Sequence, residues 1–546
     1  MSTNLSKIRR EKMLYTINEI KKNIVDEETL NNLSLIENEL TKKKYGLIWE
    51  EHEERVDKEL ETQIPVFEDV KSREIKTLNE NKYNFILEGD NLHSLYLLEK
   101  THRGKIGCIY IDPPYNRGKD DFIYNDNFVV AEDGYRHSKW LSFMGRRLEL
   151  AKRLLRDDGL IFISIDDYEY AQLKLLCDSI YGEENFINMF IWQRNSSGKT
   201  EKEKFTVNTE YVLLYSKSHN YKLNEAYKPL SDGTKAMYSK NDNDGRGNYR
   251  LYPLQKPGNP GPETTYDYVD NNGKVWPCPA KGWRIKQSKL KALENDGRLY
   301  LEGKSLSEKA YWNERSSEGK RIDTLWNDLP ENSSASKELE TIFGEKGIFN
   351  NPKPTELIKR CIQIAPNDST VLDFFVGSGT TAQAVLELNK EDGGTRNYIV
   401  CTNNENGICE NVTYRRLKTI INGNREDDTK YSDGIKSNLK YYRTSYIPRI
   451  NTDEENLSKN LMINIKNLIQ LENGIEIDDK IVRVILTEDE IDKFTTQENE
   501  LNNCEKLYIS SDILLTSKQS KIFNDYNIEL FIIPEYYFED EIREVA

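Results

Sequence analysis

The sequence lacks three patterns, and each absence excludes a class of protein. Its seven cysteines include no Cys-x-x-Cys pair and only five histidines accompany them, which argues against a disulfide framework and against a metal site such as structural zinc. No run approaches the ~18 consecutive apolar residues of a membrane-spanning helix. Residues 1–13 hold no apolar stretch of signal-peptide length. We therefore expect a cytoplasmic protein with reduced thiols, no metal and no membrane association.

Two phosphate-binding fingerprints are also missing. No G-x-x-x-x-G-K-[ST] loop is present, and no third glycine completes a G-x-G-x-x-G pattern. The second absence disfavours a nicotinamide-dependent oxidoreductase. The first indicates that any ATPase working with this protein resides on a different chain.

Charge is abundant but unevenly spread. The formal net charge is −15, yet residues 194–330 hold 24 Lys and Arg against 18 Asp and Glu, and residues 451–546 hold 9 against 22. A basic module between acidic flanks fits a polyanion that is bound locally. The alternative is a solvated surface without a partner.

Apolar runs alternate with helical patterns through two parts of the chain. Strands are predicted over 83–87, 105–111, 160–165, 370–374 and 398–402, and helices over 139–156, 355–365 and 380–389. This alternation predicts a parallel α/β sheet. Residues 195–340 interrupt it with a stretch rich in Asn, Gly, Pro and aromatics, predicted to hold few regular elements, and a long insert of this kind is usually functional.

The first chemical motif is Asp112-Pro113-Pro114-Tyr115, directly after the strand 105–111. Ligands of open α/β sheets bind at the carboxyl ends of the strands. Asp112 and the carbonyl of Pro113 can each accept an N–H of an exocyclic amine such as that of adenine, and the prolines hold the turn rigid. Tyr115 offers a face on which an extruded base can stack. The alternative is an ordinary strand-terminating turn.

The second motif runs from Asp373 to Thr380 and contains Phe375, Gly377 and Gly379 after the strand 370–374. Glycines let the backbone approach a ligand closely and adopt positive φ. An acid and an aromatic side chain at the strand end suit an adenosine-containing cofactor better than a diphosphate.

With these two motifs the sequence resembles the DNA amino-methyltransferases that use S-adenosyl-L-methionine. The order of the motifs, catalytic first and cofactor second with a long insert between them, resembles the permuted β class. Further stretches resemble the modification (Mod) subunits of type III restriction–modification systems: 44–51, 116–126, 325–328, 353–359, 403–406 and 533–538. The resemblance implies a permuted Rossmann-like methyltransferase fold.

The resemblance also implies an organisation and partners. The expected segments are an N-terminal helical segment (1–75), a catalytic half (76–217), a target-recognition domain (218–344), a cofactor half (345–430) and a C-terminal acidic domain (431–546). The expected activity is transfer of a methyl group to N6 of an adenine flipped out of double-stranded DNA. The implied partners are double-stranded DNA, a second Mod subunit and an ATP-dependent restriction (Res) subunit.

The resemblance assigns roles to individual residues. Asp112, Pro113, Pro114 and Tyr115 would be catalytic. The cofactor would contact Asp90, Asp112, Lys353, Thr355, Asp373, Phe375, Gly377, Gly379 and Glu405. Thr402 stands where many relatives carry an acid that holds the ribose hydroxyls, and Glu405 or Asn404 would replace that acid. Candidates for DNA contact are Arg194, Arg246, Arg250, Lys281, Arg284 and Lys286.

The same residues fit two other functions and leave the roles of a few side chains undecided. Methylation of cytosine N4 would use the same chemistry, and a DNA-binding specificity subunit without catalysis would use the same insert. Asp166 and Asp167 would contribute to the cofactor cleft or cap a turn. His137 and Trp140 are expected to pack in the core.

Overall fold

The chain divides into two compact units. The computed structural model describes residues 5–22, 27–41, 49–50, 52–118, 121–124, 127–130, 133–197, 205–228, 232–258, 261–315, 319–448, 454–510 and 513–533. One unit comprises Met1–Lys222 and Pro330–Ala546, and the other comprises Leu223–Leu329. Parts of the stretches that carried the resemblance lie outside the described residues: 44–48, 51, 119–120, 125–126 and 534–538.

The first unit is built on one central sheet. Its strands follow the order β1-β19-β2-β18-β17-β3-β6-β8-β7. In that order they span Gln63–Asp69, Leu439–Pro448, Asn84–Glu88, Asn397–Thr402, Thr370–Asp373, Ile106–Ile111, Leu155–Ile165, Thr209–Ser216 and Phe186–Gln193. The strands from β19 to β6 are parallel, whereas β1, β8 and β7 each pair antiparallel with a neighbour. The predicted parallel α/β sheet is therefore present.

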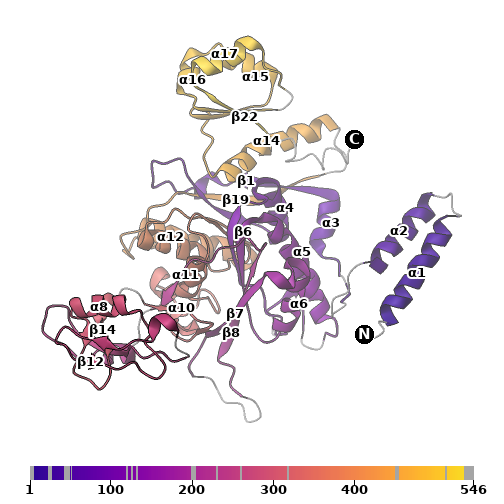
Figure 1. Ribbon diagram of the computed structural model, residues 1–546. Helices are drawn as coiled ribbons and strands as arrows, with labels where there is room; N and C mark the ends of the chain where they lie inside the picture. The colour runs from indigo at the N-terminus through magenta and orange to yellow at the C-terminus, as the bar shows by residue number, and fades with distance from the viewer. Residues whose placement is uncertain are drawn as a thin grey trace. The chain divides into compact units, whose positions relative to one another are not determined.

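Helices cover both faces of the sheet (Figure 1). Helices α4 (Asn91–His102), α5 (Arg136–Leu154) and α6 (Tyr170–Tyr181) pack in succession on one face. The opposite face carries α11 (Thr355–Ile364), α12 (Thr380–Asp392) and α13 (Arg415–Asn422), with α10 (Asn332–Phe343) against α13. All six residues of β3 are buried because the strand has helices on both faces, which explains its unbroken apolar sequence.

The two predicted halves of the sheet interleave rather than lie side by side. Strands β17 and β18, from late in the chain, lie between β2 and β3, from early in the chain. In the parallel register, Leu372 is level with Ile109. Asp112 and Phe375 each follow that pair by three residues. The two motifs therefore begin side by side at the carboxyl ends of neighbouring strands.

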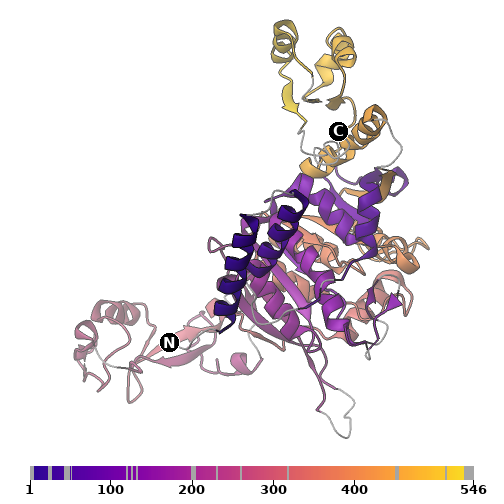
Figure 2. The same ribbon diagram turned by 90° about the vertical axis from the view of Figure 1, so that its right-hand side faces the viewer.

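Both outer segments of the predicted organisation, 1–75 and 431–546, contribute a strand to the central sheet. Within 1–75, α1 (Leu5–Lys21) and α2 (Glu27–Thr41) lie side by side (Figure 2) and α3 (Arg55–Thr62) follows, but β1 is a strand. Within 431–546, β19 pairs with β1 and β2 in the central sheet, and α14 (Glu454–Asn473) packs on β1 and α4. The sequence did not predict this pairing, because the paired strands lie more than 350 residues apart and share no local pattern.

Only the last part of the chain forms the expected small α/β module. Strands β20 (Val482–Ile485), β21 (Lys506–Ile509) and β22 (Glu529–Ile532) form a parallel sheet. It shares an apolar core with helices that span Glu488–Phe494 (α15), Glu498–Asn503 (α16) and Ser517–Asp525 (α17).

The second unit, Leu223–Leu329, is shorter than the predicted domain 218–344 and more ordered than the sequence indicated. Its sheets pair β10 with β14 and β13, β11 with β12, and β9 with β15. A core of seven buried side chains holds it together: Leu254, Tyr268, Trp276, Trp283, Leu290, Leu299 and Leu306. Its elements are β9 (Tyr227–Lys228), α7 (Asp232–Ala236), β10 (Tyr249–Pro253), β11 (Tyr268–Val269), β12 (Val275–Trp276), α8 (Gln287–Asn295), β13 (Leu299–Tyr300), β14 (Ser307–Tyr311), α9 (Trp312–Arg315), β15 (Lys320–Arg321) and β16 (Leu325–Trp326).

The remaining strands form a small hairpin near the catalytic motif, β4 (Ile123–Tyr124) with β5 (Asn127–Phe128). Across the described ranges, no helix has both the length and the apolar character that crossing a bilayer requires.

Asn438 holds the connection into β2 and provides a stability test. Its buried carboxamide donates to the carbonyls of Leu78, Glu80 and Lys82 and accepts from the N–H groups of Thr77 and Leu78. Asn438→Ala leaves these backbone groups unpaired, and we expect the free energy of unfolding to fall by roughly 3 kcal/mol.

Denaturant unfolding measures this loss, with Asn502→Ala at an exposed position of α16 as the control. Equal unfolding free energies for the two variants would contradict the role of Asn438.

Candidate active site

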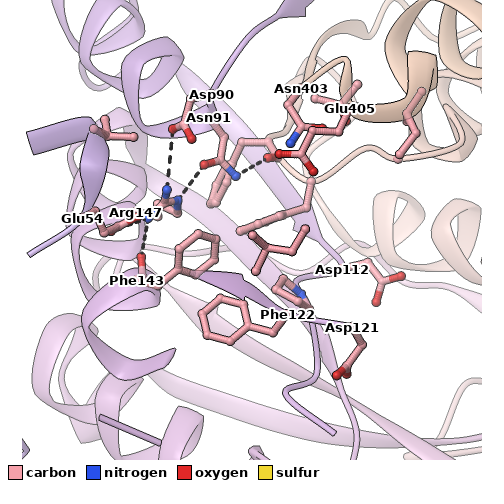
Figure 3. A pocket seen from close by; sticks show the side chains of 18 of the residues that line it. Glu54, Asp90, Asn91, Asp112, Asp121, Phe122, Phe143, Arg147, Asn403 and Glu405 are labelled. Carbon is pink, nitrogen blue, oxygen red and sulfur yellow. Dashed lines mark hydrogen bonds and ion pairs between the residues drawn. The ribbon is translucent and has the colours of Figure 1, made fainter. Parts of the chain in front are cut away.

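The carboxyl ends of the parallel strands enclose a cavity of about 410 Å³. Asp112, which follows β3, and Gly377, which follows β17, both line it. Figure 3 shows Asp112 and Asp121 toward one end of this cavity and Asp90, Asn91, Asn403 and Glu405 toward the other. The structure therefore brings both sequence motifs to one site.

Two smaller cavities adjoin the first at Asp112. The second cavity, of about 130 Å³, is lined by all four residues of the motif Asp112–Tyr115, together with Arg117, Asp121, Arg194, Glu210, Asn332, Asn351 and Lys353. The third, also of about 130 Å³, shares Phe375 and Gly377 with the first and adds Lys353, Asp373, Ser378 and Thr380 among others. Asp112 is thus common to three spaces that meet at the end of β3.

The turn after β3 is held rigidly. Its two prolines fix φ, and the buried indole of Trp140 donates to the carbonyl of Pro114 over 2.7 Å. Trp140 therefore does more than fill the core, because it fixes the turn on which Asp112 and Tyr115 stand.

A compact group of buried charges surrounds Asp112. The ammonium of Lys353 donates to both Asp112 oxygens and to the Tyr115 hydroxyl, each over 2.8 Å, and lies 3.4 Å from Glu210. The Tyr115 hydroxyl donates to Asp112 over 2.8 Å and lies 3.2 Å from Glu210. These contacts show that the Asp112 carboxylate already accepts N–H donors in this position.

Electrostatics keep this group charged despite burial. Burial opposes the ammonium form of Lys353, but Asp112 and Glu210 outweigh it and raise the pKa of Lys353 above its ordinary value. Burial likewise acts to raise the pKa of Glu210, but Lys353, Arg194 and Arg117 outweigh it, so that pKa lies below its ordinary value. Burial raises the pKa of Tyr115, with Asp112 and Glu210 acting in the same direction. Tyr115 therefore remains a neutral hydrogen-bond donor.

The glycine turn approaches the cavity closely. Gly377 has φ +48°, and a Cβ there would stand 3.1 Å from the ring of Phe349. A larger residue would therefore crowd Phe349 and narrow the cavity that both residues line. Beneath the turn, the Asp373 carboxylate accepts from the Phe375 N–H over 2.9 Å and from the Thr381 hydroxyl. Burial raises the pKa of Asp373 to about 7.

The predicted cofactor residues divide between the cavities and the layer behind them. Asp90, Asp112, Phe375, Gly377 and Glu405 line the largest cavity, and Lys353 and Asp373 line the third. Gly379 and Thr355 line none of the three: Gly379 caps α12, and the Thr355 hydroxyl donates to Glu338 over 2.5 Å. Asn404 uses its side chain to accept from the Glu410 N–H, so Glu405 is the better placed of the two ribose candidates.

The predicted DNA-binding residues lie in both units. Arg194 belongs to the first unit and donates to Glu210 over 3.1 Å. In the second unit, Lys281, Arg284 and Lys286 are exposed, whereas Arg246 donates to the Asp296 carbonyl and the Arg250 guanidinium lies 4.0 Å from the centre of the Tyr252 ring. Trp276 and Trp283, which lie close to Lys281 and Arg284 in the sequence, are buried core residues.

Sequence reasoning missed three residues of the site. Glu210 is an acid in the otherwise mostly buried strand β8, and Arg147 falls at helical spacing among the buried residues of α5; either pattern is a signal. Glu54 carries no such signal, because its place in the cavity wall depends on where the chain preceding β1 packs.

A second layer supports the catalytic turn. Asn116 has φ +56° and donates to the buried Glu169 over 2.5 Å, and Nδ1 of His137 lies 2.7 Å from the same carboxyl. The expectation that His137 packs in the core is wrong, since its side chain is 38% exposed. Asp166 accepts from Arg117 over 2.6 Å and from the Tyr168 N–H, so it caps a turn and anchors Arg117.

Glu169 gives this layer a pH signature. Burial raises its pKa from 4.5 to about 8, so the native state holds a proton that the unfolded chain releases above its ordinary pKa. The contribution of Glu169 to stability is fully present below about pH 4.5 and is lost as the pH rises toward 8. We expect wild type to lose stability relative to Glu169→Gln across this range.

Urea unfolding between pH 4 and pH 9 measures the difference, with the exposed Glu184→Gln as the control. A stability difference that does not change with pH would contradict the buried, protonated carboxyl.

Several known proteins are similar to this chain in sequence. The family model described as DNA methylase matches residues 106–445. The chain is 32% identical over 388 residues to the type III restriction-modification enzyme StyLTI Mod subunit of Salmonella typhimurium, covering 66% of this chain and 58% of that protein. It is 36% identical over 369 residues to the type II methyltransferase M.KpnI of Klebsiella pneumoniae, covering 63% of this chain and 86% of that protein.

Among solved structures, the PvuII DNA methyltransferase (cytosine-N4-specific) aligns with a TM-score of 0.32 and 14% identity, covering 60% of this chain and 85% of that one. The family match spans more than half of the chain and includes both strand-end motifs with the insert between them. The chain therefore belongs to the DNA methylase family.

Proposed function

We propose that this protein transfers a methyl group from S-adenosyl-L-methionine to N6 of an adenine in double-stranded DNA. The observation that carries the proposal is the junction of three cavities at Asp112, where the motif Asp112–Tyr115 faces the turn that contains Gly377. A methyl transfer between two bound molecules needs such a junction, because donor and acceptor must meet at one point.

The cavities fit the shape and charge of the cofactor. S-adenosyl-L-methionine has two arms that meet at a positively charged sulfur, and it supplies the methyl group when bound. The first and third cavities meet at Asp112, Phe375 and Gly377, so one can hold each arm. Asp90 and Glu405 would hold the nucleoside arm. Lys353 and Thr380 lie on the side of the other arm.

The second cavity fits a flipped base. Asp112 and the Pro113 carbonyl would accept the two N–H bonds of the amine, which leaves its lone pair facing the junction. A carboxylate oxygen has two lone pairs, so Asp112 can accept from the amine while Lys353 stays bound to it. Tyr115 would hold the base, and the prolines keep both acceptors aimed. As the amine nitrogen forms its bond to the methyl carbon, the bond from that carbon to sulfur would break and S-adenosylhomocysteine would leave. The nitrogen would then lose its proton to solvent, with no covalent enzyme intermediate.

The likeness to the StyLTI Mod subunit supports a more specific role. This chain spans 58% of the length of that protein. We propose that it is the modification subunit of a type III system, that it acts in the cytoplasm as a homodimer, and that it works with an ATP-dependent restriction subunit. The second unit, Leu223–Leu329, would recognise the target sequence.

Asp112 provides the test of the chemistry. Asp112→Asn keeps the shape of the side chain but loses one strong acceptor, so we expect methyl transfer to fall by roughly a factor of 10³ while the Kd for S-adenosyl-L-methionine changes little. The measurements are transfer of labelled methyl to DNA and calorimetric titration of the cofactor.

Asp167→Asn, an exposed neighbour at the end of β6, is the matched control. Undiminished methyl transfer by Asp112→Asn would overturn the proposal, and so would equal losses in the two variants.

The exposed basic residues of the second unit test the DNA contact. If Lys281 and Lys286 bind phosphates, replacing both with Gln weakens binding to all sequences alike and reduces the slope of log K against log salt by about 1.8, at about 0.9 for each phosphate contact. Fluorescence anisotropy at several salt concentrations measures the slope. Lys518→Gln with Lys521→Gln on α17 is the control, and an equal slope for wild type and the first double variant would remove these lysines from the interface.

A further inference from the structure

The wall of the first cavity, at the carboxyl ends of the parallel strands, contains a buried arginine that the proposed reaction does not use. Arg147 on α5 is almost completely buried. Its Nη1 donates to Glu54 over 2.9 Å and to the Phe143 carbonyl over 2.8 Å, and its Nε donates to Asn91 over 2.6 Å (Figure 3). Glu54 is itself only 6% exposed, so this is a buried ion pair.

The contacts continue from Arg147 to the glycine turn. Asn91, the first residue of α4, accepts from Arg147 and donates through Nδ2 to the Phe374 carbonyl over 2.9 Å. Phe374 directly precedes Phe375 in the cofactor motif. A single chain of hydrogen bonds therefore connects α3, α5, α4 and the turn after β17.

Asp90 stands beside this chain. One of its oxygens accepts from the Leu92 N–H over 2.7 Å and lies 3.6 Å from Nη2 of Arg147. That Nη2 is buried and makes no hydrogen bond within the described residues. The attraction between Arg147 and Asp90 thus restrains an acid at the end of the cavity opposite Asp112.

Burying such a pair brings little stability by itself. The desolvation of two charges offsets most of their attraction, and replacement by apolar residues is often neutral or stabilising. Here Glu54, Asp90, Asn91, Arg147 and Phe374 all line the same cavity. The pair therefore has a position from which it can act on whatever the cavity binds.

We propose that Glu54 and Arg147 are positioning residues for the nucleoside arm of the cofactor. They fix Asn91 and Asp90 at the far end of the cavity and, through Asn91, the backbone of the glycine turn. The inference rests on the proposed function and extends it: the chain before β1, which precedes both motifs, forms part of the cofactor site.

The test compares this ion pair with a neighbouring one. Arg147→Lys removes the guanidinium that donates to Glu54, Phe143 and Asn91 together, and Glu54→Gln removes the negative charge that faces it. Arg146→Lys is the control: it alters an outer ion pair with Asp57 that joins the same two helices, α5 and α3, and Arg146 does not line the cavity. We expect the inner variants to bind S-adenosyl-L-methionine roughly tenfold more weakly, since a loosened site must be ordered on binding.

Kinetics separate positioning from a merely structural role. The inner variants should raise KM for the cofactor roughly tenfold while kcat and KM for DNA stay within about twofold. Arg146→Lys should leave all three unchanged. A common loss of kcat in the inner variants and Arg146→Lys would overturn the inference, because it would show general destabilisation.

A second readout needs no cofactor. Amide hydrogen exchange in the free protein should accelerate at the start of α4 and in the turn 374–377 for Arg147→Lys, and not for Arg146→Lys. If wild type binds no S-adenosyl-L-methionine, the proposed function fails. The exchange data still decide whether Glu54 and Arg147 hold the start of α4 and the turn 374–377 in place. If Arg147→Lys leaves the exchange at both segments unchanged, or leaves the Kd for the cofactor unchanged, the inference is wrong while the proposed function still stands.

Discussion

The parallel pairing of β17 with β3 is the constraint on which the site depends. Because Leu372 is level with Ile109, the chain leaves both strands at the same edge and the same height. Asp112 and Phe375 then face one space although they are 263 positions apart in the sequence. A shift of this register would move the aimed acceptors away from the glycine turn, and no side chain alone could restore the junction.

Around this junction the protein concentrates charge in a buried place. Lys353 binds Asp112 and Tyr115 and lies near Glu210, which also contacts Arg194 and Arg117. Each charge is stabilised by neighbours of opposite sign, so the carboxylate that receives the amine is held in one orientation before any substrate arrives. Prearranged groups of this kind avoid reorganisation during reaction, which is where an enzyme gains most over water.

Local patterns in the sequence were enough to predict the parallel core and both motifs. The apolar runs at 105–111 and 370–374 are strands in the structure, within a residue at each end. A strand that is buried on both faces is apolar along its whole length, and this pattern is visible in the sequence. Non-local packing was not predictable in this way. The strand β19 pairs with β1, which lies more than 350 residues earlier in the sequence, and the insert forms its own core around Trp276 and Trp283 although its sequence resembles irregular coil.

The same distinction applies to the candidate site. Asp112 and Gly377 stand in motifs whose residue types indicate their chemistry. Glu54 lines the cavity only because of tertiary packing, which no local pattern indicates. Thr355 shows the opposite case: its motif pointed toward the cofactor, but its hydroxyl binds Glu338 in the layer behind. Spacing along a chain reports on strands and turns, and it does not report which of two neighbouring layers a side chain joins.

The most direct test of the central claim is to identify the methylated nucleoside. Purified protein, duplex DNA that contains its recognition sequence and S-adenosyl-L-methionine carrying a deuterated methyl group are incubated together, and the digested DNA is analysed by mass spectrometry. We expect deuterium in N6-methyladenine alone. Label in N4-methylcytosine, or no label in DNA that the protein binds, would contradict it.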